Sequence, residues 1–206
     1  MHALGLGAAM ASGCVLHAWD PPTVAWAQRD AADPHSLSTL HAQYRVLGQD
    51  PQAIRRALDR RSTWFDGTGE RFDGGTRWSL QWRHQFETTD AGCRVEDVVF
   101  SGEIEVTTPS LKTWRLPPTK LINRWTAYQT ALWTHEQHHV ARVYEAVDEA
   151  VQTVVALPAA PTCAAAGIAA NDAIRVVFQA MNIDQVAYDT RTDHGAAEGA
   201  FWDASP

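Results

Sequence analysis

The segment His135-Glu136-Gln137-His138-His139 holds the residues best suited to metal chemistry, because it fits the pattern H-E-x-x-H. On a helix, two histidines four residues apart lie on one face, about 6 Å apart along the axis, so both imidazoles can bind one zinc ion. The glutamate then lies beside the metal, where it can take a proton from a metal-bound water. The pattern therefore predicts that His135 and His139 bind Zn²⁺ and that Glu136 is the general base. His138 points about 100° away from His139 and is expected on the surface.

A catalytic zinc site needs a third protein ligand and an open position for water. His194 is the first candidate, because it is the only histidine after this segment and Gly195 gives the backbone the freedom to bring a loop close. Asp189 and Asp193 stay open as alternative ligands, although a carboxylate beside a histidine also suits accepting a hydrogen bond from the second N–H of the ring. Tyr188 is a candidate to donate a hydrogen bond to a developing oxyanion.

The zinc motif lies on a long predicted helix, which starts near Thr119 and ends at Leu157-Pro158. Its inward positions recur at steps of three and four residues: Trp125, Tyr128, Leu132, His135, His139, Val143 and Ala146. Burying two imidazoles among apolar side chains without partners is unfavourable, so a shared metal explains them better than the alternative, a pair of satisfied core histidines.

A second helix and a preceding β-rich half are also predicted. The second helix runs from about Cys163 to Ile183, with Ile174, Val177, Phe178 and Met181 buried. The earlier elements are a strand from His41 to Leu47 with Tyr44 and Val46 on one face, a helix from Pro51 to about Arg61 with Asp50 as its N-cap, a loop from Trp64 to Thr76, an alternating strand from Arg77 to Glu87, and a return strand from Cys93 to Val106 with a bend near Ser101-Gly102. We therefore expect an α+β fold: a small antiparallel sheet with one N-terminal helix, then the long H-E-x-x-H helix and a second C-terminal helix.

Composition bounds the classes of partner and of protein. The chain has 206 residues, 45% apolar and 20% charged, which is enough for one domain with its own core. With 17 basic and 24 acidic residues its net charge is −7, so no nucleic-acid-binding surface is expected. Apolar runs long enough to span a membrane are absent from the sequence. We expect a monomer that is not transmembrane.

Residues 1–27 are predicted to be an export signal or a disordered leader, followed by a single domain over residues 28–206. The stretch from Ala3 to Leu16 is apolar and small, and Ala25 and Ala27 suit a cleavage site, although no Lys or Arg precedes them. Cys14 lies in a poor lipoprotein box, so a lipid anchor is not expected. Without the leader, Cys93 and Cys163 remain as an even pair, either bonded in an oxidising compartment or free in the cytoplasm.

With these residues the sequence resembles a bacterial family of predicted secreted zinc-dependent proteases, catalogued as a domain of unknown function. The resemblance runs from about Tyr44 to Trp202. It is carried by Tyr44-Arg45-Val46-Leu47-Gly48, Thr76-Arg77-Trp78, Gly92-Cys93-Arg94-Val95, the stretch from Pro117 to Trp125, the H-E-x-x-H segment, Cys163, and Tyr188-Asp189-x-x-Thr192-x-His194-Gly195. It implies export, a Cys93–Cys163 bridge and a third metal ligand between Asp189 and His194. Glu198 departs from the family, where relatives often carry Gln, and its role stays open.

Our leading hypothesis is a zinc-dependent metallohydrolase, a secreted or periplasmic peptidase acting on peptide or protein substrates. In it His135, His139 and His194 bind the metal and Glu136 deprotonates the water. The alternative is a non-catalytic zinc-binding module of the cell envelope, in which a fourth protein ligand such as Asp189 or Asp193 closes the coordination sphere. A polysaccharide binder that uses the nine tryptophans is a weaker third hypothesis, since several of them fall on predicted core faces.

Overall fold

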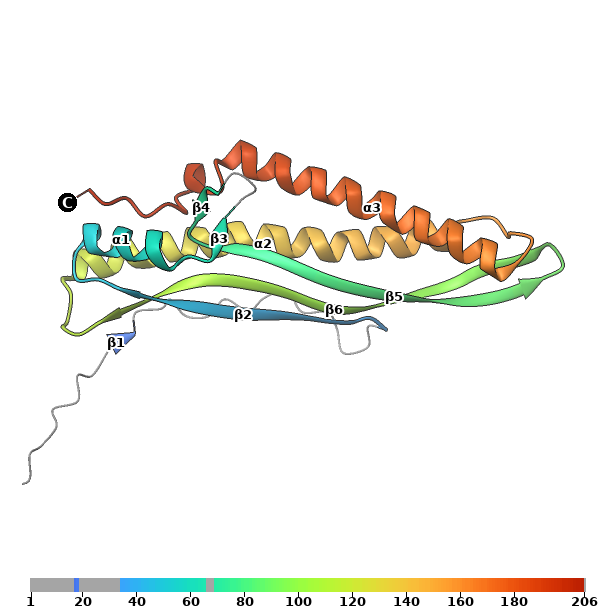
Figure 1. The fold of residues 1–206 in the computed structure, drawn as a ribbon, viewed down its shortest axis with the longest axis horizontal. Helices are drawn as coiled ribbons and strands as arrows, with labels where there is room; N and C mark the ends of the chain where they lie inside the picture. Colours follow the sequence, from blue (N-terminus) through green and yellow to red (C-terminus); the bar gives the residue numbers. More distant parts are fainter. Residues whose placement is uncertain (1–16, 19–33, 66–68, 206) are drawn as a thin grey trace, which may run out of the picture.

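A computed structural model describes residues 17–18, 34–65 and 69–205, and places two long helices on one face of a sheet (Figure 1). The elements in order are β1 (His17–Ala18), β2 (Ser36–Leu47), α1 (Pro51–Arg61), β3 (Trp64–Phe65), β4 (Arg71–Phe72), β5 (Gly75–Thr89), β6 (Gly92–Thr113), α2 (Thr119–Val155), α3 (Cys163–Thr192) and the short 3-10 helix η1 (Ala196–Glu198). The predicted α+β class is confirmed. Apart from His17 and Ala18, the predicted leader lies outside the described residues. None of the helices in these ranges combines the length and apolar composition needed to cross a bilayer.

β6 is the central strand of the sheet, and the sheet is mixed where an antiparallel one was expected. β5 pairs with β6 antiparallel, from Gly75 opposite Thr107 to Thr89 opposite Gly92. All of β2, from Ser36 to Leu47, pairs in parallel with the other side of β6. β5 runs antiparallel to β2, and the hairpin after β5 reverses the chain again. β6 therefore runs in the same direction as β2. Alternating side chains define the faces of a strand but not its direction, so the sequence did not reveal this pairing.

The irregularity in the β5–β6 hairpin lies elsewhere than predicted. The register shifts between Gln85 and Phe86, which pair with Asp97 and Val95, so Glu96 is the extra residue of a β-bulge. The pairing of β6 continues without a register shift through Ser101-Gly102, where a bend was predicted. Gly102 has a φ of +148°, and a Cβ there would collide with the carbonyl oxygen of Ser79, so this glycine permits close strand approach instead.

The helices agree with the sequence pattern, except at the end of α3. Asp50 caps α1 as predicted, its Oδ1 accepting a hydrogen bond from the Ala53 N–H at 2.7 Å. All seven inward positions predicted for α2 are buried. α3 continues nine residues beyond the predicted end, Ile183, and therefore carries Tyr188 and Asp189 on helix rather than on a loop.

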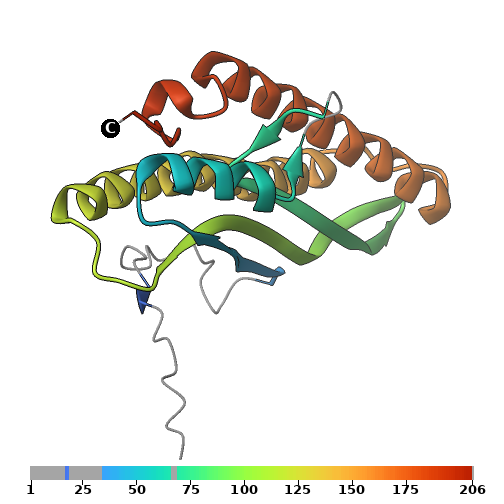
Figure 2. The ribbon, with the colours of Figure 1, turned by 60° about the vertical axis from the view of Figure 1, so that its left-hand side comes forward.

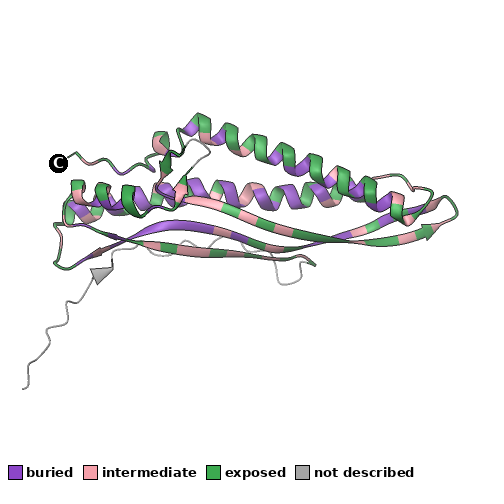
Figure 3. Ribbon diagram, in the orientation of Figure 1, coloured by how far each residue is buried: buried purple, intermediate pink, exposed green. Residues whose placement is uncertain are grey.

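Two apolar clusters form the core, and the H-E-x-x-H segment lies where they meet. One cluster fills the space between the sheet and the two long helices, with Phe100, Ile104 and Ile174 among its members. The other joins α1 to the first half of α2, with Ile54 and Trp125 among its members. Figure 2 shows the helices on one side of the sheet, and Figure 3 shows buried residues concentrated along α2 and the middle of β6. On α2 the second cluster ends at Leu132 and the first begins at Trp133, just before the motif.

Cys93 and Cys163 form a disulfide, as the resemblance implied. The bond joins the start of β6 to the start of α3. Beside it, the backbones of Cys93 and Ala160 exchange two hydrogen bonds, both 2.8 Å long. Because β6 and α3 enclose the first core cluster, this junction fixes the end of the molecule far from α1 (Figure 1).

Replacing both cysteines by serine is expected to lower the free energy of unfolding by about 4 kcal/mol. The disulfide closes a loop with a sequence separation of 70 residues, and this magnitude is the chain-entropy value for a loop of roughly that length. Urea titration followed by circular dichroism, on the oxidised wild type and on Cys93→Ser/Cys163→Ser, measures the difference. Reduced wild-type protein is the matched control and should behave like the variant; equal midpoints for all three would contradict the expectation.

Candidate metal centre

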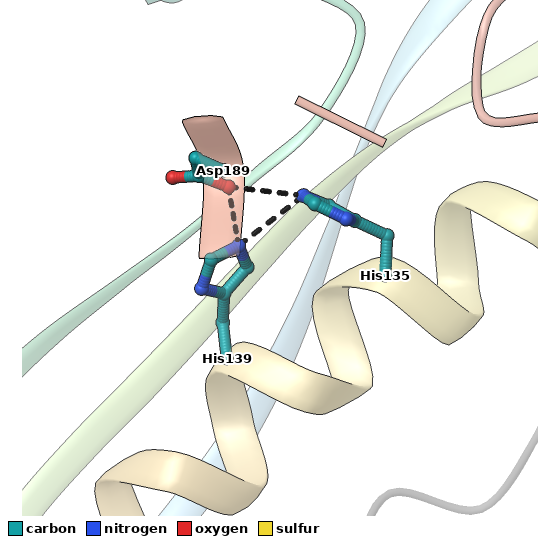
Figure 4. A group of neighbouring side chains, drawn as sticks. All are labelled: His135, His139 and Asp189. Atoms are coloured by element: carbon teal, nitrogen blue, oxygen red, sulfur yellow. Dashed lines mark hydrogen bonds and ion pairs between the residues drawn. The ribbon is translucent and has the colours of Figure 1, made fainter. Parts of the chain in front are cut away.

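Three potential metal ligands come together from α2 and α3 (Figure 4). His135 and His139 lie one turn apart on α2, with their Nε2 atoms 3.2 Å apart. Oδ1 of Asp189, on α3, lies 3.2 Å from Nε2 of His135 and 2.9 Å from Nε2 of His139. Tetrahedral zinc ligands at about 2.0–2.1 Å from the metal are about 3.3 Å from one another. The three atoms, 2.9–3.2 Å apart, are close to this spacing and could together hold one metal ion.

Each imidazole has a partner for its second nitrogen. Nδ1 of His135 lies 3.1 Å from Oε2 of Glu198 in η1, and Nδ1 of His139 lies 2.7 Å from Oε1 of Gln185 in α3. A carboxylate or amide oxygen accepts, so Nδ1 is the donor in both rings, and Nε2 is left to bind a metal when the ring is neutral or to donate to Asp189 when the ring is charged. This arrangement fixes the ring orientations and directs both Nε2 atoms at the shared point. Glu198, whose role the sequence left open, is thus a partner of His135.

The charges at this point favour a cation. Burial opposes ionisation of Asp189, but its hydrogen bonds to His135 and His139 outweigh burial and hold its pKa well below the usual range. Burial also opposes a charged His135, whereas Asp189 and the nearby charge of Glu136 act the other way and raise its pKa overall. Asp189 is therefore a carboxylate at neutral pH, placed to neutralise imidazolium or a metal ion.

Glu136 is buried next to the two histidines. Its Oε2 accepts a hydrogen bond from Oγ1 of Thr76, at the start of β5, at 2.7 Å. Burial raises the pKa of Glu136 despite the opposing effects of His139 and Thr76. A raised pKa makes a carboxylate a better base near neutral pH. The sequence pattern gave no sign that Thr76 contacts Glu136, because this contact spans 60 residues between a strand and a helix.

A cavity of about 500 Å³ adjoins these residues, and its lining includes His135, Glu136, His139 and Asp189. This volume is typical of pockets that bind small molecules or short segments of a larger substrate. The arrangement can hold a cation, activate water beside it and admit a substrate from one side.

His194, the predicted third ligand, lies outside the ligand group. Its ring is exposed and stacks on Phe72, with 4.1 Å between ring centroids. It borders the same cavity, but the structure brings Asp189, one of the two alternatives, to the histidine pair. The reason is the length of α3: the chain leaves the helix only at Asp193, which is exposed at the cavity rim in the left-handed conformation.

Tyr188 lies behind the histidines rather than in the cavity wall. Its hydroxyl donates to Oε2 of Glu198 at 2.9 Å, and its ring stacks on that of His138, with 3.7 Å between ring centroids. Burial and the Glu198 carboxylate raise the pKa of Tyr188, so the phenol stays a neutral donor. The structure therefore gives its hydroxyl a different partner from the predicted oxyanion. His138 is exposed, as predicted.

Comparison with known protein families identifies one family that matches most of the chain. A model of a family described as "Bacterial protein of unknown function (DUF922)" matches residues 41–195. The chain belongs to this family. The matched region contains both histidines, Glu136, Asp189 and the disulfide, whereas Glu198 lies just beyond it. No curated protein and no solved structure matches the chain.

Proposed function

We propose that this protein is a zinc-dependent metallohydrolase, a peptidase of a secreted or periplasmic compartment. The observation that carries the proposal is the convergence of His135, His139 and Asp189 on a cavity in which Glu136 is buried beside them. When bound, zinc supplies a water of lowered pKa and polarises a carbonyl oxygen. The disulfide supports an oxidising compartment.

The side chains around the proposed metal site have separate roles in peptide hydrolysis. Glu136 takes the proton of the attacking water and transfers it to the leaving amine, and its hydrogen bond from Thr76 orients it. Glu198 and Gln185 fix the two imidazoles, and Asp189 supplies the negative charge of the ligand set.

The alternative, a non-catalytic zinc module, requires a closed coordination sphere. Among the residues that the structure describes, one group with three possible ligand atoms forms, and the cavity opens directly on it. Asp189 serves here as the third ligand rather than the fourth. This open side favours catalysis.

The test combines metal analysis with a peptide library. Purified protein should contain about one zinc ion per chain and cleave peptides, with cleavage lost on chelation and restored by Zn²⁺. Elemental analysis and mass spectrometry of the cleaved library provide the two measurements. Stoichiometric zinc without cleavage would support the binding module instead, and absence of zinc binding would overturn both hypotheses.

Replacing Glu198 by alanine is expected to raise the dissociation constant for Zn²⁺ by about 10- to 100-fold, because His135 loses the acceptor that orients it. Glu198→Gln keeps an acceptor oxygen and should lose less. Competition with a chromophoric chelator measures the constants. Glu103→Ala, at an exposed position of β6, is the control and should bind like wild type; an unchanged Glu198→Ala variant would show that this hydrogen bond does not support the metal site.

A further inference from the structure

Aromatic side chains are exposed where the cavity meets solvent. Phe65 and Phe201 are 62% and 57% exposed, and both border the cavity. They come from two segments far apart in sequence, strand β3 and the stretch after η1, and Trp64 and Phe72 border the cavity with them. Large apolar side chains gathered around a concave site mark a place where a ligand removes them from water.

Three of these rings, those of Phe201, Phe72 and Trp64, have close neighbours. The guanidinium of Arg55 lies 5.5 Å from the Phe201 ring centroid, and two hydrogen bonds to Asp73 and one to Asp59 fix the guanidinium in turn. Phe72 stacks on His194. A Cβ on Gly75 would collide with the Trp64 ring, so glycine lets that ring lie against the start of β5. The rings of Phe201, Phe72 and Trp64 are therefore preorganised for contact with an apolar group.

The charges around the cavity exclude one class of side chain. Six carboxylate residues border it, against two arginines: Asp59, Glu70, Asp73, Glu136, Asp189 and Asp193, with Arg55 and Arg71. Arg55 is bound to Asp73 and Asp59, and Arg71 donates to the Ser62 carbonyl at 2.7 Å. Even with a divalent cation in place, the balance is negative, so an acidic side chain of a ligand meets repulsion here.

We infer that the cavity binds an extended peptide through an aromatic or large aliphatic side chain next to the bond that is cleaved, with Phe65 and Phe201 as specificity-determining residues. This inference rests on the proposed function. A carbohydrate also stacks on aromatic rings, but glycoside cleavage uses a pair of carboxylates across the bond rather than a cluster of metal ligands. The position of the rings beside the ligand group favours the peptide.

The test measures binding separately from turnover. Zinc-loaded Glu136→Gln protein is titrated calorimetrically with three peptides that differ only in a central Phe, Ala or Asp. We expect the Phe peptide to bind about tenfold more tightly than the Ala peptide, the Asp peptide to bind most weakly, and Phe201→Ala and Phe65→Ala to remove most of the preference for Phe. Phe86→Ala, 43% exposed and away from the cavity, is the matched control and should keep it.

The outcomes separate this inference from the proposed function. Zinc-loaded wild type that cleaves peptides without regard to the central residue, or Phe65→Ala and Phe201→Ala variants that keep the full preference for Phe, would overturn the inference and leave the peptidase intact. Zinc-loaded protein that neither binds nor cleaves any peptide would overturn the proposed function itself. Binding of a chito-oligosaccharide in place of the peptides, lost in Phe201→Ala, would replace the peptide by a carbohydrate.

Discussion

Glu136→Gln is expected to keep about one zinc ion per chain and to lower kcat/KM for peptide cleavage by about 10²- to 10⁴-fold. Glutamine has nearly the shape of glutamate, and its amide oxygen still accepts the hydrogen bond from Thr76, which is 2.7 Å long in the wild type. It cannot take a proton from water. The ligands His135, His139 and Asp189 are unchanged, so metal binding and turnover should separate.

Elemental analysis and kinetics on the best library peptide check this expectation. Glu103→Gln, exposed on β6, is the matched control and should turn over like wild type. The metal-free Glu136→Gln protein should also melt no lower than wild type, because burial raises the pKa of Glu136 and its ionised form therefore lowers folded-state stability at neutral pH. Equal kcat/KM in Glu136→Gln and wild type would remove Glu136 from the mechanism.

Asp189→Ala is expected to raise the dissociation constant for Zn²⁺ by roughly 10²- to 10³-fold, whereas His194→Ala should change it less than about threefold. A zinc site with four ligands is worth about 10–16 kcal/mol, so one ligand contributes about a quarter of that. Asp189 lies within 3.2 Å of both Nε2 atoms, whereas His194 stacks on Phe72 outside the group.

Chelator competition on the two variants gives the ranking directly. Both residues border the same cavity, so each variant is the control for the other's effect on cavity shape. The opposite ranking, with His194→Ala the weaker binder, would make His194 the third ligand and would mean that the segment after α3 moves when the metal binds.

The sequence by itself determined the parts of this site that depend on neighbours along one element. The spacing of His135 and His139 places both imidazoles on one face of α2 because a helix repeats every 3.6 residues. The same periodicity identified the buried face of α2, and Asp50-Pro51 identified the start of α1. These signals are local, so they need no knowledge of the rest of the fold.

The tertiary structure alone decided which side chains meet those histidines. Beyond Met181, the positions at steps of three and four along α3 are Gln185, Tyr188 and Thr192, and Tyr188 and Thr192 are buried. The helical period thus continues to the end of α3. A search for apolar residues at this period does not detect it, because Gln185 and Thr192 are polar. That pattern ended the helix near Ile183 and left Asp189 in a loop. Gln185 and Asp189 are half-buried on α3 because His139 of α2 is a hydrogen-bond partner of both, and these contacts join residues 46 and 50 positions apart along the chain.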